Sequence, residues 1–143
     1  DLSSWKTSNV VNMNQMFFQA KRFNGDISDW DVSQVTSMNS MFNGADSFNA
    51  DISKWDVHNV RDFQSIFDHA VAFNCDLSSW DLSSAENIDY MFHSATAFNQ
   101  DLSNWDTRNV QKMAGVFAEA SSFNGDISTW SLSNVKDLHS MFF

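Results

Sequence analysis

The sequence is poor in the residues that break, crosslink or anchor a chain. It has no proline, four glycines and one cysteine among 143 residues. Because Cys75 stands alone, an internal disulfide framework is excluded. No apolar run is long enough to cross a bilayer, and no signal peptide is visible. Eight basic residues face 18 acidic ones, and the net charge of −10 argues against nucleic acid and anionic membranes as partners.

What the sequence contains instead is a strict repeat. Six tryptophans recur one every 25 residues without insertion or deletion, at Trp5, Trp30, Trp55, Trp80, Trp105 and Trp130. A repeat of this length predicts a solenoid, in which each coil buries its apolar side chains against its neighbours. We interpret residues 1–143 as a single solenoid domain. Its repeats are residues 1–25, 26–50, 51–75, 76–100, 101–125 and the partial repeat 126–143.

The aligned repeats share residues at fixed positions, which we number 1 to 25 from the first aspartate. Position 3 is always Ser, position 5 Trp and position 17 Phe, and positions 20 and 23 are Ala and Phe in every complete repeat. Position 1 is occupied by Asp1, Asp26, Asp51, Asp76, Asp101 and Asp126. Position 24 is occupied by Asn24, Asn49, Asn74, Asn99 and Asn124. We interpret all three series, Trp, Asp and Asn, as structural ladders that stack one coil on the next.

The spacing of apolar residues changes within each repeat. Trp30 and Val32 flank one polar residue, which predicts a short strand with both side chains turned inward. Val35, Met38 and Phe42 then follow three and four residues apart, which is helical spacing. We therefore expect a leucine-rich-repeat-like solenoid with one short parallel strand and one short α or 3₁₀ segment in each 25-residue coil.

The repeat unit also resembles a known family. Residues 26–49 contain Asp-Ile-Ser-x-Trp-Asp-Val-Ser-x-Val, followed by Met-Phe-x-x-Ala-x-x-Phe-Asn, and the pattern recurs along the whole chain. This motif resembles the BspA-like leucine-rich-repeat-type repeats of mycoplasma lipoproteins and bacterial surface proteins, with relatives in algae, protists and viruses. The resemblance implies a surface-exposed or secreted interaction protein, often proposed as an adhesin, and no enzymatic activity. Lys6 and Ser131, which replace the usual Asp after Trp, are among the few departures.

The tryptophan and asparagine series each have a structural interpretation. Trp shares parity with the inward residue two positions later, so we favour a buried aromatic ladder over an exposed strip for sugar rings. The asparagines resemble the ladder of leucine-rich repeats, in which a buried amide pairs with backbone groups at a bend.

The aspartate series requires a partner, because stacked carboxylates repel one another. Either each Asp accepts hydrogen bonds from backbone N–H groups and the position-3 serine hydroxyl, or cations bind between coils. We favour the hydrogen bonds, because the turn lacks the glycine-rich pattern with several Asp that is typical of calcium-binding solenoids.

The residues that carry catalysis or bind metals form no recurring pattern. His58, His69, His93 and His139 fall at four different positions of the repeat, and the pair His69 and His93 has no third metal ligand in view. Cys75 has no neighbouring base, and no glycine-rich phosphate loop is present. We expect no catalytic residue, no cofactor and no metal site.

Together these patterns predict a non-enzymatic scaffold that is extracellular or at the cell surface. Its partners would be proteins or further copies of itself, through adhesion or through head-to-tail stacking into a fibre. The rival hypothesis is a carbohydrate-binding module that uses the Trp and Asp ladders, with glycans as the less favoured partner. Neither terminal repeat has a distinct capping sequence, so we expect either a longer chain or stacking between molecules.

Overall fold

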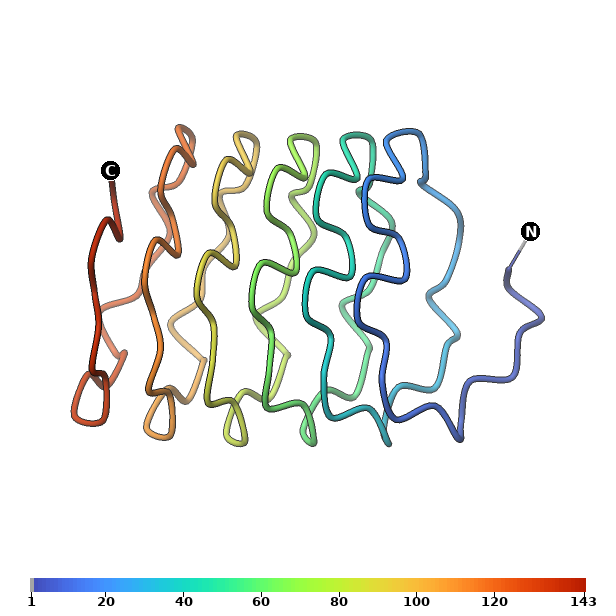
Figure 1. The fold of residues 1–143 in the computed structure, drawn as a ribbon, viewed down its shortest axis with the longest axis horizontal. Helices are drawn as coiled ribbons and strands as arrows, with labels where there is room; N and C mark the ends of the chain where they lie inside the picture. The colour runs from blue at the N-terminus through green and yellow to red at the C-terminus, as the bar shows by residue number, and fades with distance from the viewer. Residues whose placement is uncertain (1) are drawn as a thin grey trace.

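The computed structural model describes residues 2–143, and Asp1 of the aspartate series lies outside them. The chain winds into coils that stack along the long axis of the molecule, with the N-terminus at one end and the C-terminus at the other (Figure 1). Each coil corresponds to one repeat, because isolated parallel bridges join residues that are 25 apart in the sequence. They link Asn12, Ser37, Asp62, Asn87, Lys112 and Asp137 in turn.

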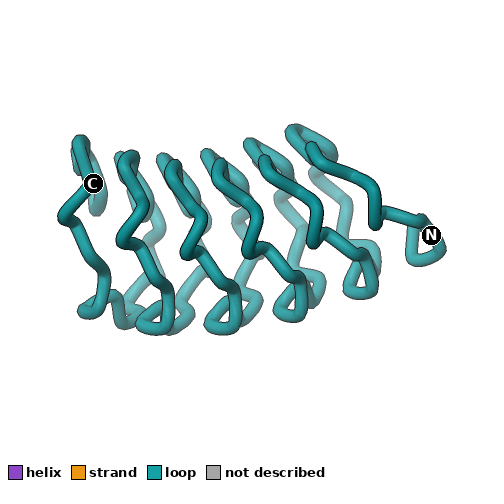
Figure 2. Tube along the Cα trace, turned by 90° about the horizontal axis from the view of Figure 1, so that it is seen from below, coloured by secondary structure: helices purple, strands orange, loops and turns teal. Residues whose placement is uncertain are grey.

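The expected secondary structure is wrong. Within residues 2–143 there is no helix and no strand, and Figure 2 shows the trace as loops and turns throughout. Among residues 2–143, only the six residues of the isolated bridges form β-type pairs. A leucine-rich-repeat-like fold with a parallel strand and an α or 3₁₀ segment in each coil therefore does not describe this protein.

Hydrogen bonding between coils explains why the segment with helical spacing is not helical. In the coil of residues 51–75, the N–H groups of Phe63, Ser65, Phe67 and His69 donate to carbonyls of the next coil over 2.8–3.0 Å. Between them, the N–H groups of Ile66 and Asp68 donate three residues back within the same coil, over 3.1 and 3.2 Å. The Gln64 N–H donates to a side-chain oxygen of Asp62 over 3.0 Å. Because alternate N–H groups leave the coil, a continuous helical ladder cannot form.

Backbone conformation marks the same segment. Positions 15 and 19 adopt positive φ in every repeat that reaches them, although only two of these residues are glycine. The residues are Gln15, Gln19, Ser40, Gly44, Ser65, His69, Tyr90, Ser94, Gly115, Glu119 and Ser140. Left-handed residues interrupt a right-handed helix, so the spacing of three reflects successive turns.

Turns also replace the expected strand. The Trp30 N–H donates to the Ile27 carbonyl over 3.1 Å, and the Val35 N–H donates to the Val32 carbonyl over 2.9 Å. Trp30 and Val32 both point into the core, with at most 3% of each side chain exposed. Two consecutive turns thus bury the same side chains that a strand would have buried, which is why alternation in the sequence did not distinguish them.

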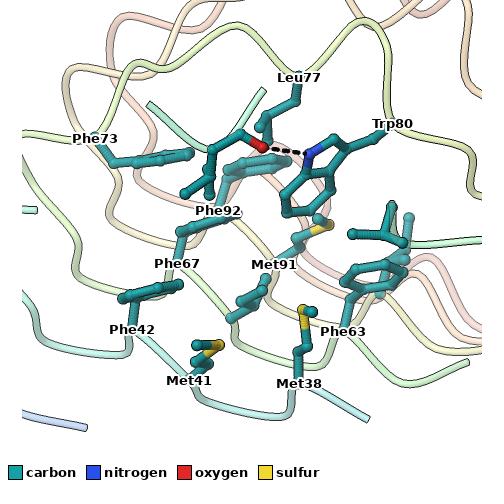
Figure 3. Close-up of a cluster of buried hydrophobic side chains, with 14 of the residues drawn as sticks. Met38, Met41, Phe42, Phe63, Phe67, Phe73, Leu77, Trp80, Met91 and Phe92 are labelled. Carbon is teal, nitrogen blue, oxygen red and sulfur yellow. Dashed lines mark hydrogen bonds between the residues drawn. The ribbon is translucent and has the colours of Figure 1, made fainter. Parts of the chain in front are cut away.

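The core is a set of aromatic rows that run from coil to coil. Within a coil, the rings at positions 17 and 23 stack closely, as for Phe67 and Phe73 with centroids 3.8 Å apart. Between coils, Phe42, Phe67 and Phe92 stack at 5.8 and 5.7 Å. Figure 3 shows these rings beside methionines of the same coils. Stacked aromatic pairs contribute about 0.5–1.5 kcal/mol each beyond area burial, so the rows hold neighbouring coils in register.

Exposed apolar side chains gather at the two ends of the stack. Trp5 and Phe18 in the first coil are 52% and 48% exposed, and Phe142 and Phe143 in the last coil are 64% and 86% exposed. Trp80 and Phe67, the central-coil counterparts of Trp5 and Phe142, are buried. The two end coils therefore carry apolar surface that no neighbouring coil covers.

Candidate functional site

The tryptophan series forms part of the core. Trp30, Trp55, Trp80 and Trp105 are 2–3% exposed, Trp130 is half-buried, and Trp5 is exposed in the first coil. Each indole from Trp30 onward donates to the position-2 carbonyl of the preceding coil, and the dashed line in Figure 3 marks this bond from Trp80 to Ile52 over 3.1 Å. The polar edge of each ring from Trp30 onward is thus used inside the stack, and the four buried indoles offer no flat face for a sugar.

The asparagine series pairs one coil with the next, but on the surface. The side-chain oxygen of Asn49 accepts a hydrogen bond from the Asn74 N–H over 2.8 Å, and equivalent bonds join Asn24, Asn49, Asn74, Asn99 and Asn124 in order. All five asparagines are exposed. The prediction of a buried amide is therefore wrong, because the bend at position 24 lies outside the aromatic core.

The aspartate series accepts hydrogen bonds within its own turn. One oxygen of Asp26 accepts from the Ser28 N–H over 3.0 Å and from the Ser28 hydroxyl over 2.7 Å, and these bonds hold the pKa of Asp26 below its ordinary value of 3.8. Asp51, Asp76 and Asp126 have a lowered pKa for the same reason. Asp101 accepts the equivalent N–H from Ser103 over 2.9 Å. Each described carboxylate is thus satisfied locally, as the first alternative for this series supposed.

A polar groove of about 500 Å³ runs across several coils at positions 8 to 11. Its position-11 residues are Arg61, Glu86, Gln111 and Lys136, and its position-9 residues include Asn109 and Asn134. The side chains of Asn109 and Asn134 have a structural role, because they donate to backbone carbonyls of the preceding coil over 2.7 and 2.6 Å. The position-11 side chains remain as a row on the surface.

Position 11 is the most varied of the groove positions. Six repeats place six different residues there: Val11, Thr36, Arg61, Glu86, Gln111 and Lys136. Side-chain contacts that link neighbours in this row include an ion pair between Arg61 and Glu86 at 3.5 Å and a hydrogen bond from Lys136 to Gln111 over 3.2 Å. The Thr36 hydroxyl also donates to the Val11 carbonyl over 3.3 Å. Exposed ion pairs contribute little to stability, so these side chains are available for recognition.

His69 and His93 occupy a different corner of the coils, at positions 19 and 18 of the repeat. His69 and His93 both contact one oxygen of Asp68 through their Nδ1 atoms, at 2.6 and 2.8 Å. Asp68 is the third partner that the sequence pattern did not reveal for the two histidines. The repeat spacing could have predicted this contact, because Asp68 and His93 are 25 residues apart and therefore occupy the same position in adjacent coils.

A second histidine contact joins more distant coils. The Tyr90 hydroxyl lies 2.9 Å from Nε2 of His139, and Nδ1 of His139 lies 2.8 Å from Asp137. Tyr90 reaches this histidine across Gly115, which lacks the side chain that would block it. The side chains of His139 and Asp137 are both more than half exposed, so this row lies open to water.

Comparison with known proteins yields one family. The family model described as Mycoplasma protein of unknown function, DUF285, matches residues 1–98 and again residues 76–143. The two matches overlap and together cover every residue, as expected for a tandem repeat with a constant period. Comparisons with curated proteins and with solved structures give no match. In the part of the chain that the structure describes, no helix is long and apolar enough to span a membrane.

Proposed function

The chain belongs to the Mycoplasma protein family of unknown function DUF285, and for this member we propose a non-enzymatic scaffold that binds protein partners outside the cell. The observation that carries the proposal is that each repeat combines invariant positions with one highly varied surface position. Invariant residues build the core and the ladders, whereas position 11 holds six different side chains, four of which line the groove. A constant frame with a varied surface row is how repeat proteins create binding surfaces.

The location is part of the proposal. The resemblance of the motif to BspA-like repeats supports a place at the cell surface or in the extracellular space, with adhesion as the finer function. The net charge of −10 favours solubility and disfavours nucleic acids and anionic membranes as partners. Cleavage of the protein by a protease added to intact cells would support this location, and protection until lysis would contradict it.

Carbohydrate binding by the tryptophans finds less support. Four of the six indoles are 2–3% exposed and donate their N–H groups to the preceding coil. A sugar ring would need the flat face of an exposed aromatic residue, so the buried row argues against this alternative.

The groove can be tested with two variants of equal charge change. The variant Arg61→Ala with Lys136→Ala alters the groove, and Lys21→Ala with Arg22→Ala removes two exposed charges elsewhere. Each is compared with the wild-type chain on an array of purified extracellular protein domains, and affinities are then measured with any domain that binds. We expect the groove variant to weaken binding by about tenfold or more, because central interface residues dominate affinity.

The same array separates the competing functions. The control variant should bind as the wild type does. Equal losses in the two variants would place binding outside the groove. Binding to a glycan array with a change in tryptophan emission, and to no protein domain, would overturn the proposal in favour of carbohydrate recognition.

Head-to-tail contact with a second copy is a further part of the partner proposal. Backbone N–H groups at positions 13, 15, 17 and 19 donate to the next coil, as from Met13 to the Ser37 carbonyl over 3.0 Å. At these positions the last coil therefore presents donors and the first coil presents acceptors, whereas position 11 has the opposite polarity, as from the Thr36 N–H to the Val11 carbonyl over 2.8 Å. Together with the exposed apolar side chains of both end coils, this polarity supports end-to-end association.

A further inference from the structure

We propose that Asp68, His69 and His93 bind one divalent transition-metal ion of the Zn²⁺ class. Among residues 2–143 they form the one group of three histidine, cysteine or acidic side chains whose ligand atoms all lie within 4.8 Å of one another. Asp68 and His69 belong to the coil of residues 51–75, whereas His93 belongs to the next coil. The ion would therefore join two adjacent coils.

The donor set selects the class of metal. Two imidazoles and one carboxylate suit zinc and related transition metals, whereas Mg²⁺ and Ca²⁺ prefer oxygen ligands alone. Zinc bonds to these atoms are about 2.0–2.2 Å long, so a tetrahedral site places its ligand atoms about 3.3 Å apart. The Nδ1 atoms of His69 and His93 lie 2.6 and 2.8 Å from the Asp68 oxygen. Small side-chain rotations would open this cluster enough to admit the ion.

The surroundings hold the ligands in place. The Asn43 side chain donates to the second oxygen of Asp68 over 3.0 Å, and partners of this kind orient a coordinating carboxylate. The His69 N–H also donates to the His93 carbonyl over 2.8 Å, which fixes the spacing of the two histidines. The two rings meet edge to face with centroids 5.0 Å apart. Backbone and neighbouring side chains thus preorganise all three ligands.

Burial distinguishes this cluster from the other histidine contacts. The side chains of Asp68 and His93 are 15% and 26% exposed, and His69 covers them with 55% exposure. By comparison, His58 and Asp56 form a pair of similar length, 2.6 Å, with both side chains about half exposed and no third ligand. The ion would bind at Nδ1 of each ring, and each neutral imidazole would then carry its single proton on Nε2. A water molecule would complete the coordination.

Titration of the tag-free, chelator-treated chain with Zn²⁺ at about pH 7.5 tests the site by calorimetry. We expect saturable binding of one ion per chain. His93→Ala and Asp68→Asn should each weaken that binding by at least about tenfold, because each removes a direct ligand and even the loss of a residue that only orients a ligand costs about that much. His58→Ala is the matched control and should leave the affinity unchanged. Excess Mg²⁺ should not compete.

A second variant and readout guard against loss of folding. His69 is the most exposed of the three ligands, so His69→Ala should fold and still bind Zn²⁺ at least about tenfold more weakly. Zn²⁺ should also raise the thermal midpoint of the wild type more than that of His69→Ala, because the ion binds only the folded wild-type site tightly. No saturable binding, or equal losses in His58→Ala and His69→Ala, would overturn the proposal and leave a hydrogen-bonded Asp and His cluster.

Discussion

Single carboxylates in this protein act as local turn caps. Asp26 and Asp51 bond the serine two residues later through both its N–H and its hydroxyl, and Asp31 repeats the arrangement with Ser33. The hydrogen bond from the Ser33 hydroxyl lowers the pKa of Asp31 the most, and the bond from the Ser33 N–H lowers it further. Short polar side chains of this kind satisfy a bend without help from neighbouring elements, which suits a chain without helices or strands.

These caps predict an acid-sensitive fold. A carboxyl whose pKa is lower in the folded chain stabilises it fully above the unfolded pKa and loses that contribution as the pH falls through the folded pKa. The pKa of Asp51 and Asp76 is below the ordinary value of 3.8. The thermal midpoint should therefore drop as the pH falls below about 4. Melting curves followed by tryptophan fluorescence over this pH range measure the effect.

Amide substitutions provide the control for acid sensitivity. Asp51→Asn with Asp76→Asn keeps an acceptor oxygen for each serine but removes the titrating groups, so the midpoint should fall less between neutral and acidic pH. Asp29→Asn removes an exposed carboxylate for which no turn bond is seen within residues 2–143, and it should follow the wild type. A double variant as acid-sensitive as the wild type would show that other groups govern acid unfolding.

At the level of the element, each coil consists of successive turns whose apolar side chains point into the core. Position 15 and position 19 need a left-handed backbone, and glycine supplies it only at Gly44 and Gly115. The other copies accept the unfavourable conformation, which costs roughly 1 kcal/mol per residue. The surrounding bonds between coils must offset that energy, so the segment from position 13 to position 19 depends on its neighbours for its shape.

Gly115→Ala should destabilise the protein more than Gly44→Ala. Both substitutions add a Cβ at positive φ, which costs about 1 kcal/mol. At Gly115 the new atom would lie 2.5 Å from the ring of Tyr90, which is held by His139, and such overpacking costs about 1–3 kcal/mol more. At Gly44 it would meet only the flexible amide of Gln19. Urea denaturation of both variants measures the difference.

A double variant checks the cause of that difference. Tyr90→Ala removes the ring that the new Cβ would meet, so Gly115→Ala should cost about 1 kcal/mol in that background, as it does at Gly44. The same loss with and without Tyr90 would mean that the backbone conformation alone decides the effect. Losses at Gly44 as large as at Gly115 would contradict the role of the ring.

At the level of the whole molecule, the stack has two unlike ends. N–H groups at positions 13, 15, 17 and 19 donate to the next coil and those at position 11 donate to the preceding coil, so the two ends present different unpaired groups. Apolar side chains such as Trp5, Phe18, Phe142 and Phe143 are also exposed at the ends. Contacts between unlike ends propagate instead of closing into a dimer.

The isolated 143-residue chain should therefore associate further as its concentration rises. Leu138→Ser with Phe142→Ser should shift it towards monomers, because both side chains are exposed on the last coil. Val71→Ser, at a 40% exposed apolar residue in a central coil, is the control. Sedimentation velocity over a range of concentrations measures the size distribution. A monomer at every concentration, or an equal effect of Val71→Ser, would contradict end-to-end association.

Much of the arrangement could be predicted from the sequence. The constant period places residues that are 25 apart in adjacent coils, and the bridges from Asn12 to Ser37 and from Ser37 to Asp62 show that register. The apolar positions point inward, as Trp30 and Phe42 do. The partners of Asp26 follow from the short reach of its side chain to Ser28. Each of these features depends on spacing along the chain or on contacts two residues away.

The period, the register and the inward residues follow from the amino-acid sequence alone, because similar repeats can bury their apolar side chains only against one another. The path of the backbone between those residues is decided by contacts between coils. Turns, strands and short helices all bring Trp30 and Val32 or Met38 and Phe42 to one side, and the hydrogen bonds to the next coil select turns. The meeting of Asp68 with both His69 and His93 was decided in the same way, because it arises between two coils and not within one.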